Sequence, residues 1–216
     1  MLVSHRKKFI YTKTAKTAST SVESYFEMYC MPMGEWEFQH ARDEYESEAG
    51  IIGYRGPETP GKRWFNHMAA EKIRDAVGPE VWDSYFKFSV IRNPFDKLVS
   101  GFFFAEKESG SAAELIAGFR AWVKSGGEII DRHTYTIDGA LCLDYFIRYE
   151  NLEAGIHEVC DVLGIPFEAD RLPRLKAAFR QRDIPLADFY DEETTEIVRT
   201  KYAFELAQFN YHSPLA

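Results

Sequence analysis

A run of small and hydroxyl-bearing residues surrounds a lysine near the start of the chain. It reads Thr14-Ala15-Lys16-Thr17-Ala18-Ser19-Thr20-Ser21. Small side chains let the backbone approach a ligand closely, and successive N–H groups at a helix start can bind an oxyanion. The Lys16 ammonium would add positive charge there. A capped helix start beside a solvated lysine has the same composition, so this segment alone leaves both interpretations open.

A second segment with candidate anion ligands lies in the middle of the chain. It reads Val90-Ile91-Arg92-Asn93-Pro94-Phe95-Asp96-Lys97-Leu98-Val99-Ser100. The Arg92 guanidinium presents a planar fork of donors that suits phosphate, and the Ser100 hydroxyl adds another donor. Because Ser100 lies roughly two turns into the helix expected after Arg92, the two could bind one phosphate. A surface arginine and an ordinary helix serine are the alternative.

Together, the two segments resemble the donor-binding motifs of one enzyme family. Residues 16–21 look like the 5′-phosphosulfate loop of Golgi-type and bacterial carbohydrate sulfotransferases, especially the heparan 2-O-sulfotransferase relatives. Residues 92–100 resemble their 3′-phosphate motif. The resemblance spans nearly the whole chain, with further similar segments at Arg148-Tyr149-Glu150-Asn151-Leu152 and Tyr190-Asp191-Glu192-Glu193-Thr194. It implies a sulfotransferase that uses 3′-phosphoadenosine 5′-phosphosulfate (PAPS) and releases adenosine 3′,5′-bisphosphate (PAP).

The resemblance also assigns roles to individual residues. Lys16 would contact the 5′-phosphate and the bridging oxygen of the donor, while Arg92 and Ser100 would hold its 3′-phosphate. Lys176 and Arg180 lie in a stretch similar to one that closes over the nucleotide, although an exposed charged helix face is the alternative. The remaining candidate donors to the phosphosulfate group are Thr17, Ala18, Ser19, Thr20 and Ser21.

Two positions depart from the family pattern. Ala15 stands where many relatives have proline, and Ser19 stands where many bacterial members have glycine. Neither change removes a ligand, though the stiffness of the loop could differ. No metal is implied, because no close set of His, Cys, Asp or Glu has ligand spacing.

Transfer of a sulfuryl group to a hydroxyl requires a group that accepts the proton of that hydroxyl. Histidine suits this role near neutral pH. We select His67, because the segment from Asn66 to Ile73 resembles the family segment that carries the base. A histidine that caps or packs against a helix start is the alternative, and His40 and His133 are the reserve candidates.

Strands and helices alternate along the chain in a way that would position these residues. We expect strands at about 9–11, 86–91 and 143–147, with Lys16 and Arg92 just after the ends of the first two. This order predicts an α/β, P-loop-NTPase-like three-layer fold in which helices flank a central parallel sheet. The whole chain, 1–216, is expected to be one domain, with an irregular excursion at about 34–63. We expect a first helix whose apolar face is Val22, Phe26 and Tyr29. The other expected helices span about 69–77, 94–106, 112–124, 152–163 and 192–209.

Composition narrows the function further. The net charge of −8 argues against a nucleic-acid partner, and no apolar run is long enough for a membrane span. Without a recognisable signal peptide, a soluble, cytoplasmic protein is expected. The three cysteines, at wide spacing, are expected to be buried thiols. The oligomeric state stays open.

The acceptor and two competing functions remain to be considered. Acidic residues concentrated in 35–58 favour a neutral small-molecule or carbohydrate acceptor over a sulfated polyanion. A nucleotide-dependent small-molecule kinase is one alternative, although no glycine precedes Gly34 to form a Walker motif. A noncatalytic nucleotide-binding module of the same fold is the other.

Overall fold

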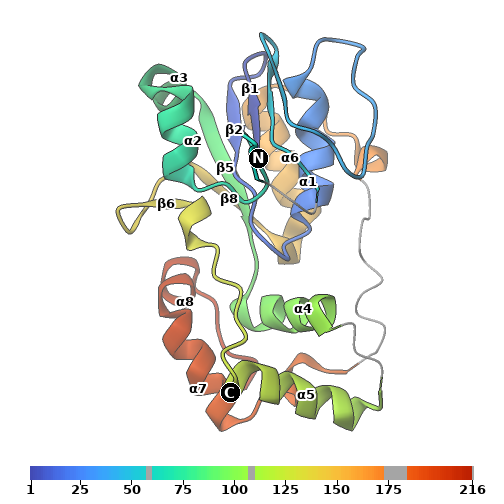
Figure 1. Ribbon diagram of the computed structural model, residues 1–216, viewed down its shortest axis with the longest axis vertical. Coiled ribbons are helices and arrows are strands. Elements are labelled where there is room, and N and C mark those ends of the chain that lie inside the picture. The colour runs from blue at the N-terminus through green and yellow to red at the C-terminus, as the bar shows by residue number, and fades with distance from the viewer. Residues whose placement is uncertain (57–59, 107–109, 173–183, 216) are drawn as a thin grey trace. The chain divides into compact units, whose positions relative to one another are not determined.

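The structure is a computed structural model that describes residues 1–56, 60–106, 110–172 and 184–215 (Figure 1). Residue contacts divide the chain into two compact units. The first comprises Met1–Ile91 and Asp131–Leu175, and the second comprises Arg92–Ile130 and Lys176–Ala216. Neither unit is a continuous stretch of sequence. Lys176 and Arg180 lie outside the described residues.

A six-stranded sheet with the order β3-β4-β1-β2-β5-β8 forms the centre of the first unit. Its strands are β1 (Leu2–Ser4), β2 (Phe9–Tyr11), β3 (Tyr45–Ser47), β4 (Gly50–Ile52), β5 (Phe86–Ile91) and β8 (Tyr145–Arg148). Strands β2, β5 and β8 are parallel, whereas β1, β3 and β4 add an antiparallel half. The predicted parallel core is therefore confirmed, and the sheet is wider and more mixed than the sequence indicated.

The antiparallel half corrects the interpretation of residues 34–63 as wholly irregular. Strands β3 and β4 form a hairpin inside that excursion, and β4 pairs with β1. Each strand has three residues, which is too short to show a period in the sequence. Gly50 permits the close pairing, because a Cβ at this position would collide with the carbonyl oxygen of Val3.

Helices cover both faces of the sheet, as predicted (Figure 1). Side chains alternate between faces along each strand, so Phe9 and Ile10 belong to different cores. The Phe9 face packs against α1 (Ser19–Phe26) and α6 (Leu152–Leu163). The Ile10 face packs against α2 (Ala70–Val77) and α3 (Pro79–Ser84).

The second unit is helical and has its own aromatic core. Its helices are α4 (Pro94–Glu106), α5 (Ala112–Lys124), α7 (Glu192–Lys201) and α8 (Ala203–Phe209). The predicted single helix at 192–209 is wrong, because it breaks at Tyr202 into α7 and α8. The apolar spacing suits one helix, but the buried Tyr202 leaves helical geometry, and its hydroxyl accepts the Ile129 N–H at 2.8 Å.

Shorter elements complete the chain. The hairpin β6 (Thr136–Ile137) and β7 (Ala140–Leu141) follows a 3₁₀ turn, η2 (Arg132–Thr134), in the first unit. The other described 3₁₀ turns are η1 (Glu27–Cys30), η3 (Tyr149–Asn151), η4 (Ala169–Arg171) and η6 (Leu186–Phe189).

Candidate active site

The loop between β2 and α1 starts from a firmly held base. The Thr12 N–H donates to the Phe88 carbonyl at 3.1 Å, and the Ser89 hydroxyl donates to the Thr12 carbonyl at 2.8 Å. Two residues later, the Thr14 hydroxyl donates to the Val90 carbonyl at 2.5 Å. These bonds extend the parallel pairing with β5 beyond the end of β2. The loop therefore leaves the sheet in a defined direction.

The backbone of this loop adopts an uncommon conformation. Lys16 and Ala18 have φ values of 59° and 56°, in the left-handed region that residues with a Cβ seldom occupy. Such a conformation costs on the order of 1–3 kcal/mol and persists only where the surrounding fold imposes it. His67, in another segment, has a φ of 56° as well. The strained positions thus include both residues proposed from the sequence for catalysis.

Four consecutive backbone donors at the end of the loop have no acceptor within the described chain. They are the N–H groups of Thr17, Ala18, Ser19 and Thr20. Helix α1 makes its first bonds only from Ser21 and Val22, both to the Ala18 carbonyl. Unpaired N–H groups at a helix N-terminus carry partial positive charge and bind anions. The loop is therefore a candidate anion-binding site.

The hydroxyls of the loop divide into two groups. The Thr17 hydroxyl is buried and lies 2.8 Å from the Thr14 hydroxyl, so it holds the loop together. The Thr20 side chain is half-buried, as is that of Lys16, so both reach the surface. Ser19 is buried, and its carbonyl accepts a hydrogen bond of 3.1 Å from Tyr11. Thr17 therefore contributes to the anion site through its backbone.

His67 lies two residues before Ala69, the N-cap of α2, and is hydrogen-bonded to the same loop. Its Nδ1 is 3.0 Å from the carbonyl oxygen of Lys13. A carbonyl only accepts, so Nδ1 carries the proton and Nε2 keeps its lone pair. Burial, followed by the Lys13 ammonium, lowers the pKa of His67 to about 4. The imidazole is therefore neutral at pH 7 and able to accept a proton at Nε2.

A buried group of charges holds Lys13 next to this histidine. The Lys13 ammonium contacts the Glu23 carboxylate at 2.5 Å and the Asn66 amide oxygen at 3.1 Å. Glu23 also binds Arg55 at 2.7 Å and the α-amino group of Met1 at 2.9 Å. Burial alone would raise the pKa of Glu23, but these cations lower it below its ordinary value. The group ties α1, the excursion and the His67 segment together.

The second candidate anion segment belongs to the second unit. The Arg92 Nε donates to the Asp96 carboxylate at 2.8 Å, and a second guanidinium nitrogen lies 2.8 Å from the same oxygen. Asp96 and Ser100 are four residues apart in α4 and share one face of that helix. The Ser100 hydroxyl has no hydrogen-bond partner among the described residues. Asn93 caps α4 by accepting the Phe95 N–H at 3.0 Å.

Comparison with known proteins identifies the family. The model of the sulfotransferase family matches residues 1–212. The chain belongs to the sulfotransferase family. An uncharacterized protein of Archaeoglobus fulgidus is 32% identical over 108 residues, which is 48% of this chain and 88% of that protein. Membership supports sulfuryl transfer as the general chemistry and confirms the family predicted from the two motifs.

One residue that contacts the candidate anion-binding loop was missed by the sequence reasoning. Asp131 is buried, and its carboxylate accepts the Ala15 N–H at 2.6 Å. It lies between α5 and η2, where no local pattern in the sequence marks a functional residue. Of the reserve histidines, His133 has its Nε2 3.2 Å from the His67 carbonyl, while His40 is exposed and offers its carbonyl to Arg55.

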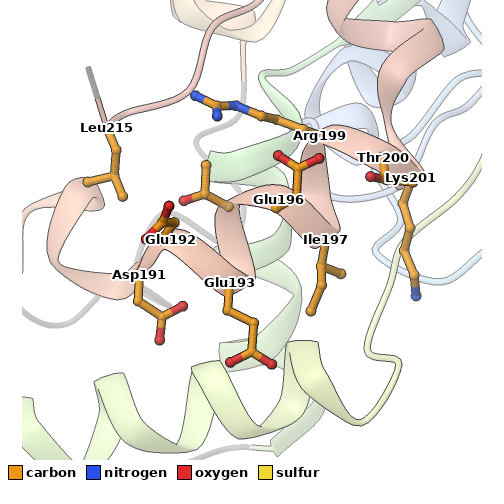
Figure 2. A pocket seen from close by; sticks show the side chains of 10 residues that line it. Asp191, Glu192, Glu193, Glu196, Ile197, Arg199, Thr200, Lys201 and Leu215 are labelled. Atoms are coloured by element: carbon orange, nitrogen blue, oxygen red, sulfur yellow. The ribbon is translucent and has the colours of Figure 1, made fainter.

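A pocket in the second unit is a poor candidate for binding the sulfotransferase donor. It lies along α7 beside Leu215, and Figure 2 shows several acidic side chains around it. The lining also includes Arg199 and Lys201, but its four acids leave it negative overall, which disfavours a nucleotide with several negative charges. The acids are Asp191, Glu192, Glu193 and Glu196.

No group of three or more His, Cys, Asp or Glu in the parts of the chain that the structure describes has the arrangement of a metal site. No helix in the same parts combines the length and the apolar character needed to cross a bilayer.

Proposed function

We propose that this protein transfers the sulfuryl group of PAPS to the hydroxyl of a neutral sugar, a phenol or another small alcohol. The observation that carries the proposal is the row of four unpaired N–H groups from Thr17 to Thr20. It follows a lysine, and the same loop holds a neutral histidine through the Lys13 carbonyl. Anion binding and proton acceptance are thus assigned to two segments of the first unit that are bonded to each other.

Each candidate residue receives a role in donor binding. The N–H row and the Lys16 ammonium bind the 5′-phosphosulfate, together with the hydroxyls of Thr20 and Ser21. Arg92 and Ser100 bind the 3′-phosphate, which distinguishes PAPS from ATP. When bound, PAPS supplies an activated sulfuryl group. Lys16 neutralises the negative charge that develops on the leaving phosphate, the main requirement in a dissociative in-line transfer.

His67 is proposed to accept the proton of the attacking hydroxyl. The bond from Nδ1 to the Lys13 carbonyl fixes the tautomer and directs the lone pair of Nε2 away from that carbonyl. A histidine with a pKa of about 4 is a weak base. A bound polyanionic donor favours the protonated imidazole and raises this pKa. Donor binding would therefore increase the basicity of His67 before the proton is transferred.

The acceptor is proposed to be uncharged. The excursion carries the exposed acids Glu35, Glu37 and Glu48, which would repel a sulfated polymer. Arg42 and Arg55 from the same excursion are buried against Glu23 and Glu27 and are thus already neutralised. The surface of the excursion is therefore negative.

The direct test is incubation of the purified protein with radiolabelled PAPS and a panel of sugars, phenols and small alcohols. We expect label transfer to at least one uncharged acceptor. PAP should raise the melting temperature more than ATP at equal concentration. A larger shift with ATP, together with phosphate transfer, would contradict the proposal and favour a kinase.

His67→Ala tests the assigned base. Turnover should fall by about 10²–10⁴-fold, because a positioned general base contributes that much. PAP affinity should change little, since His67 is not a proposed phosphate ligand. His157→Ala is the matched control and should keep its turnover, because His157 is exposed in α6 and its contacts are with Asp161 and Phe167. Unchanged turnover in His67→Ala would eliminate His67 as the base.

A further inference from the structure

The turn from Asp131 to Thr134 contacts the anion-binding loop through a buried carboxylate. Asp131 is 4% exposed, and its Oδ2 accepts the Ala15 N–H at 2.6 Å. The turn is itself rigid, because the Asp131 carbonyl accepts both the N–H and the hydroxyl of the buried Thr134, at 2.9 and 2.8 Å. The carboxylate thus fixes the residue just before Lys16.

The same turn also reaches the segment of the proposed base. His133 Nε2 lies 3.2 Å from the carbonyl oxygen of His67. One short turn therefore contacts the anion-binding loop on one side and the His67 backbone on the other. Lys13 connects the two from within the loop, through its own carbonyl. Movement of this turn would displace both groups together.

The charge of Asp131 is unusual for its location. Lys13 and the α-amino group of Met1 face His67 and disfavour its protonated form, after the larger effect of burial. Asp131 acts in the opposite direction and favours the imidazolium. His133 is exposed, and its polar contact is with the His67 carbonyl at 3.2 Å, so it lies on the backbone side of His67. A carboxylate next to an anion site weakens anion binding, so its presence calls for a compensating role.

We propose that Asp131 is a positioning residue for sulfuryl transfer. Its carboxylate holds Ala15 so that the following N–H groups converge on the donor, and its charge stabilises the imidazolium that forms when His67 accepts the proton of the acceptor. This role rests on the proposed function. It divides into a geometric part, which needs an acceptor oxygen, and an electrostatic part, which needs the negative charge.

Two substitutions separate these parts. Asp131→Asn keeps an oxygen that can accept the Ala15 N–H but removes the charge. Asp131→Ala removes both. Asp138→Asn is the matched control, because Asp138 is exposed in the turn between β6 and β7 and its left-handed backbone suits asparagine. The variants are compared by calorimetric titration with PAP and by NMR titration of the His67 imidazole in the ligand-free protein.

The expected results differ between the variants. Asp131→Ala should bind PAP roughly tenfold more weakly, the effect of losing a hydrogen bond to a charged group. Asp131→Asn should bind PAP at least as tightly as the wild type, yet its His67 should titrate at lower pH and its turnover should fall. Asp138→Asn should match the wild type in both measurements. The same PAP affinity in Asp131→Ala and the same His67 titration in Asp131→Asn would overturn the proposal.

The NMR measurement distinguishes failure of this inference from failure of the proposed function. The His67 titration needs neither PAPS nor turnover. A protein that binds no PAP but whose His67 shifts in Asp131→Asn would contradict the PAPS assignment while retaining the electrostatic link. If Asp131→Ala does not fold, Asp131→Asn and its control still decide the electrostatic part.

Discussion

The two candidate anion-binding segments differ in the kind of hydrogen-bond donor they offer and in whether that donor is already paired. In the β2–α1 loop the donors are backbone N–H groups from Thr17 to Thr20, and within the described chain they have no acceptor. In the Arg92 segment the donor is a side chain that already binds the Asp96 carboxylate. The first segment has a strained backbone and presents unpaired donors. A phosphate bound at the second segment would share the Arg92 guanidinium with Asp96.

This difference has an energetic consequence. Backbone donors held by the fold need little reordering when an anion binds, so most of their interaction appears as affinity. An arginine that is paired within the protein gains less, because the internal pair offsets part of the new interaction. We therefore expect the loop to determine whether an anion binds and the Arg92 segment to determine which nucleotide is preferred.

The largest effect is expected for Lys16→Ala. Turnover should fall about a thousandfold, as when one group that stabilises transition-state charge is removed. Lys8→Ala is a matched control, because Lys8 is exposed and also has a positive φ of 52°. Steady-state kinetics with PAPS would measure both variants. Equal losses in the two would show that general positive charge, and not the loop lysine, is responsible.

Arg92→Ala should change nucleotide selectivity more than general anion binding. Its affinity for PAP should fall roughly 10–100-fold, while its affinity for AMP, which lacks the 3′-phosphate, should stay near that of the wild type. Lys16→Ala should weaken the binding of both nucleotides. Calorimetry measures all four affinities. A comparable loss of AMP binding in Arg92→Ala would erase the distinction between the two segments.

Between pH 7 and pH 5, histidine titration should affect stability through His67, which is bonded to the first segment, and not through residues 92–100, which contain no histidine. The pKa of His67 is about 4 in the folded protein and near 6.5 in the unfolded chain. Between these values the unfolded chain binds more protons, so the free energy of unfolding decreases as the pH falls below 6.5. At pH 5 the decrease from His67 is about 2 kcal/mol.

Urea unfolding of the wild type and His67→Gln at pH 7 and pH 5 measures this contribution. The variant should lose less stability between the two pH values. His133→Gln, at an exposed position, should behave like the wild type. Equal losses of stability in the wild type and His67→Gln would show that burial does not lower the pKa of the His67 imidazole.

The smallest effect is expected for Ala18→Gly. Glycine tolerates the left-handed conformation of Ala18, so unfolding should cost up to about 1 kcal/mol more. Ala113→Gly, on the exposed face of α5, should destabilise by a similar amount, because glycine weakens a helix interior. Thermal unfolding would show a higher melting temperature for Ala18→Gly and a lower one for Ala113→Gly. A loss of stability in Ala18→Gly would argue that the loop is not strained.

The parts of the fold that could be predicted are those with a local pattern. Strand β5 and helices α4, α5 and α6 have long apolar periods or clear stop signals, and their predicted bounds match the structure. Strands β1, β3 and β4 have three residues each and depend on pairing with one another. The break at Tyr202 depends on its contact with Ile129. Neither the pairing of these short strands nor the contact of Tyr202 produces a recognisable pattern in the surrounding sequence.

The candidate site divides in the same way. Lys16, Arg92 and His67 could be selected because their neighbours form recognisable segments, and their roles stay predictions. Asp131 could not be selected, because the contact that links it to the site is with Ala15, which is far away in the sequence. Its flanking residues carry no phosphate-binding or catalytic pattern. A buried acid that acts on a distant backbone N–H becomes visible only once the chain is folded.

The interleaving of the two units affects how the chain is made. Strand β5 is flanked by β2 and β8, but residues 92–130 of the other unit are synthesised before β8. Until Tyr145–Arg148 leaves the ribosome, one edge of β5 has no strand to pair with. A ribosome that pauses between these strands would hold an open sheet edge next to Phe88 and Val90, a form suited to recognition by chaperones.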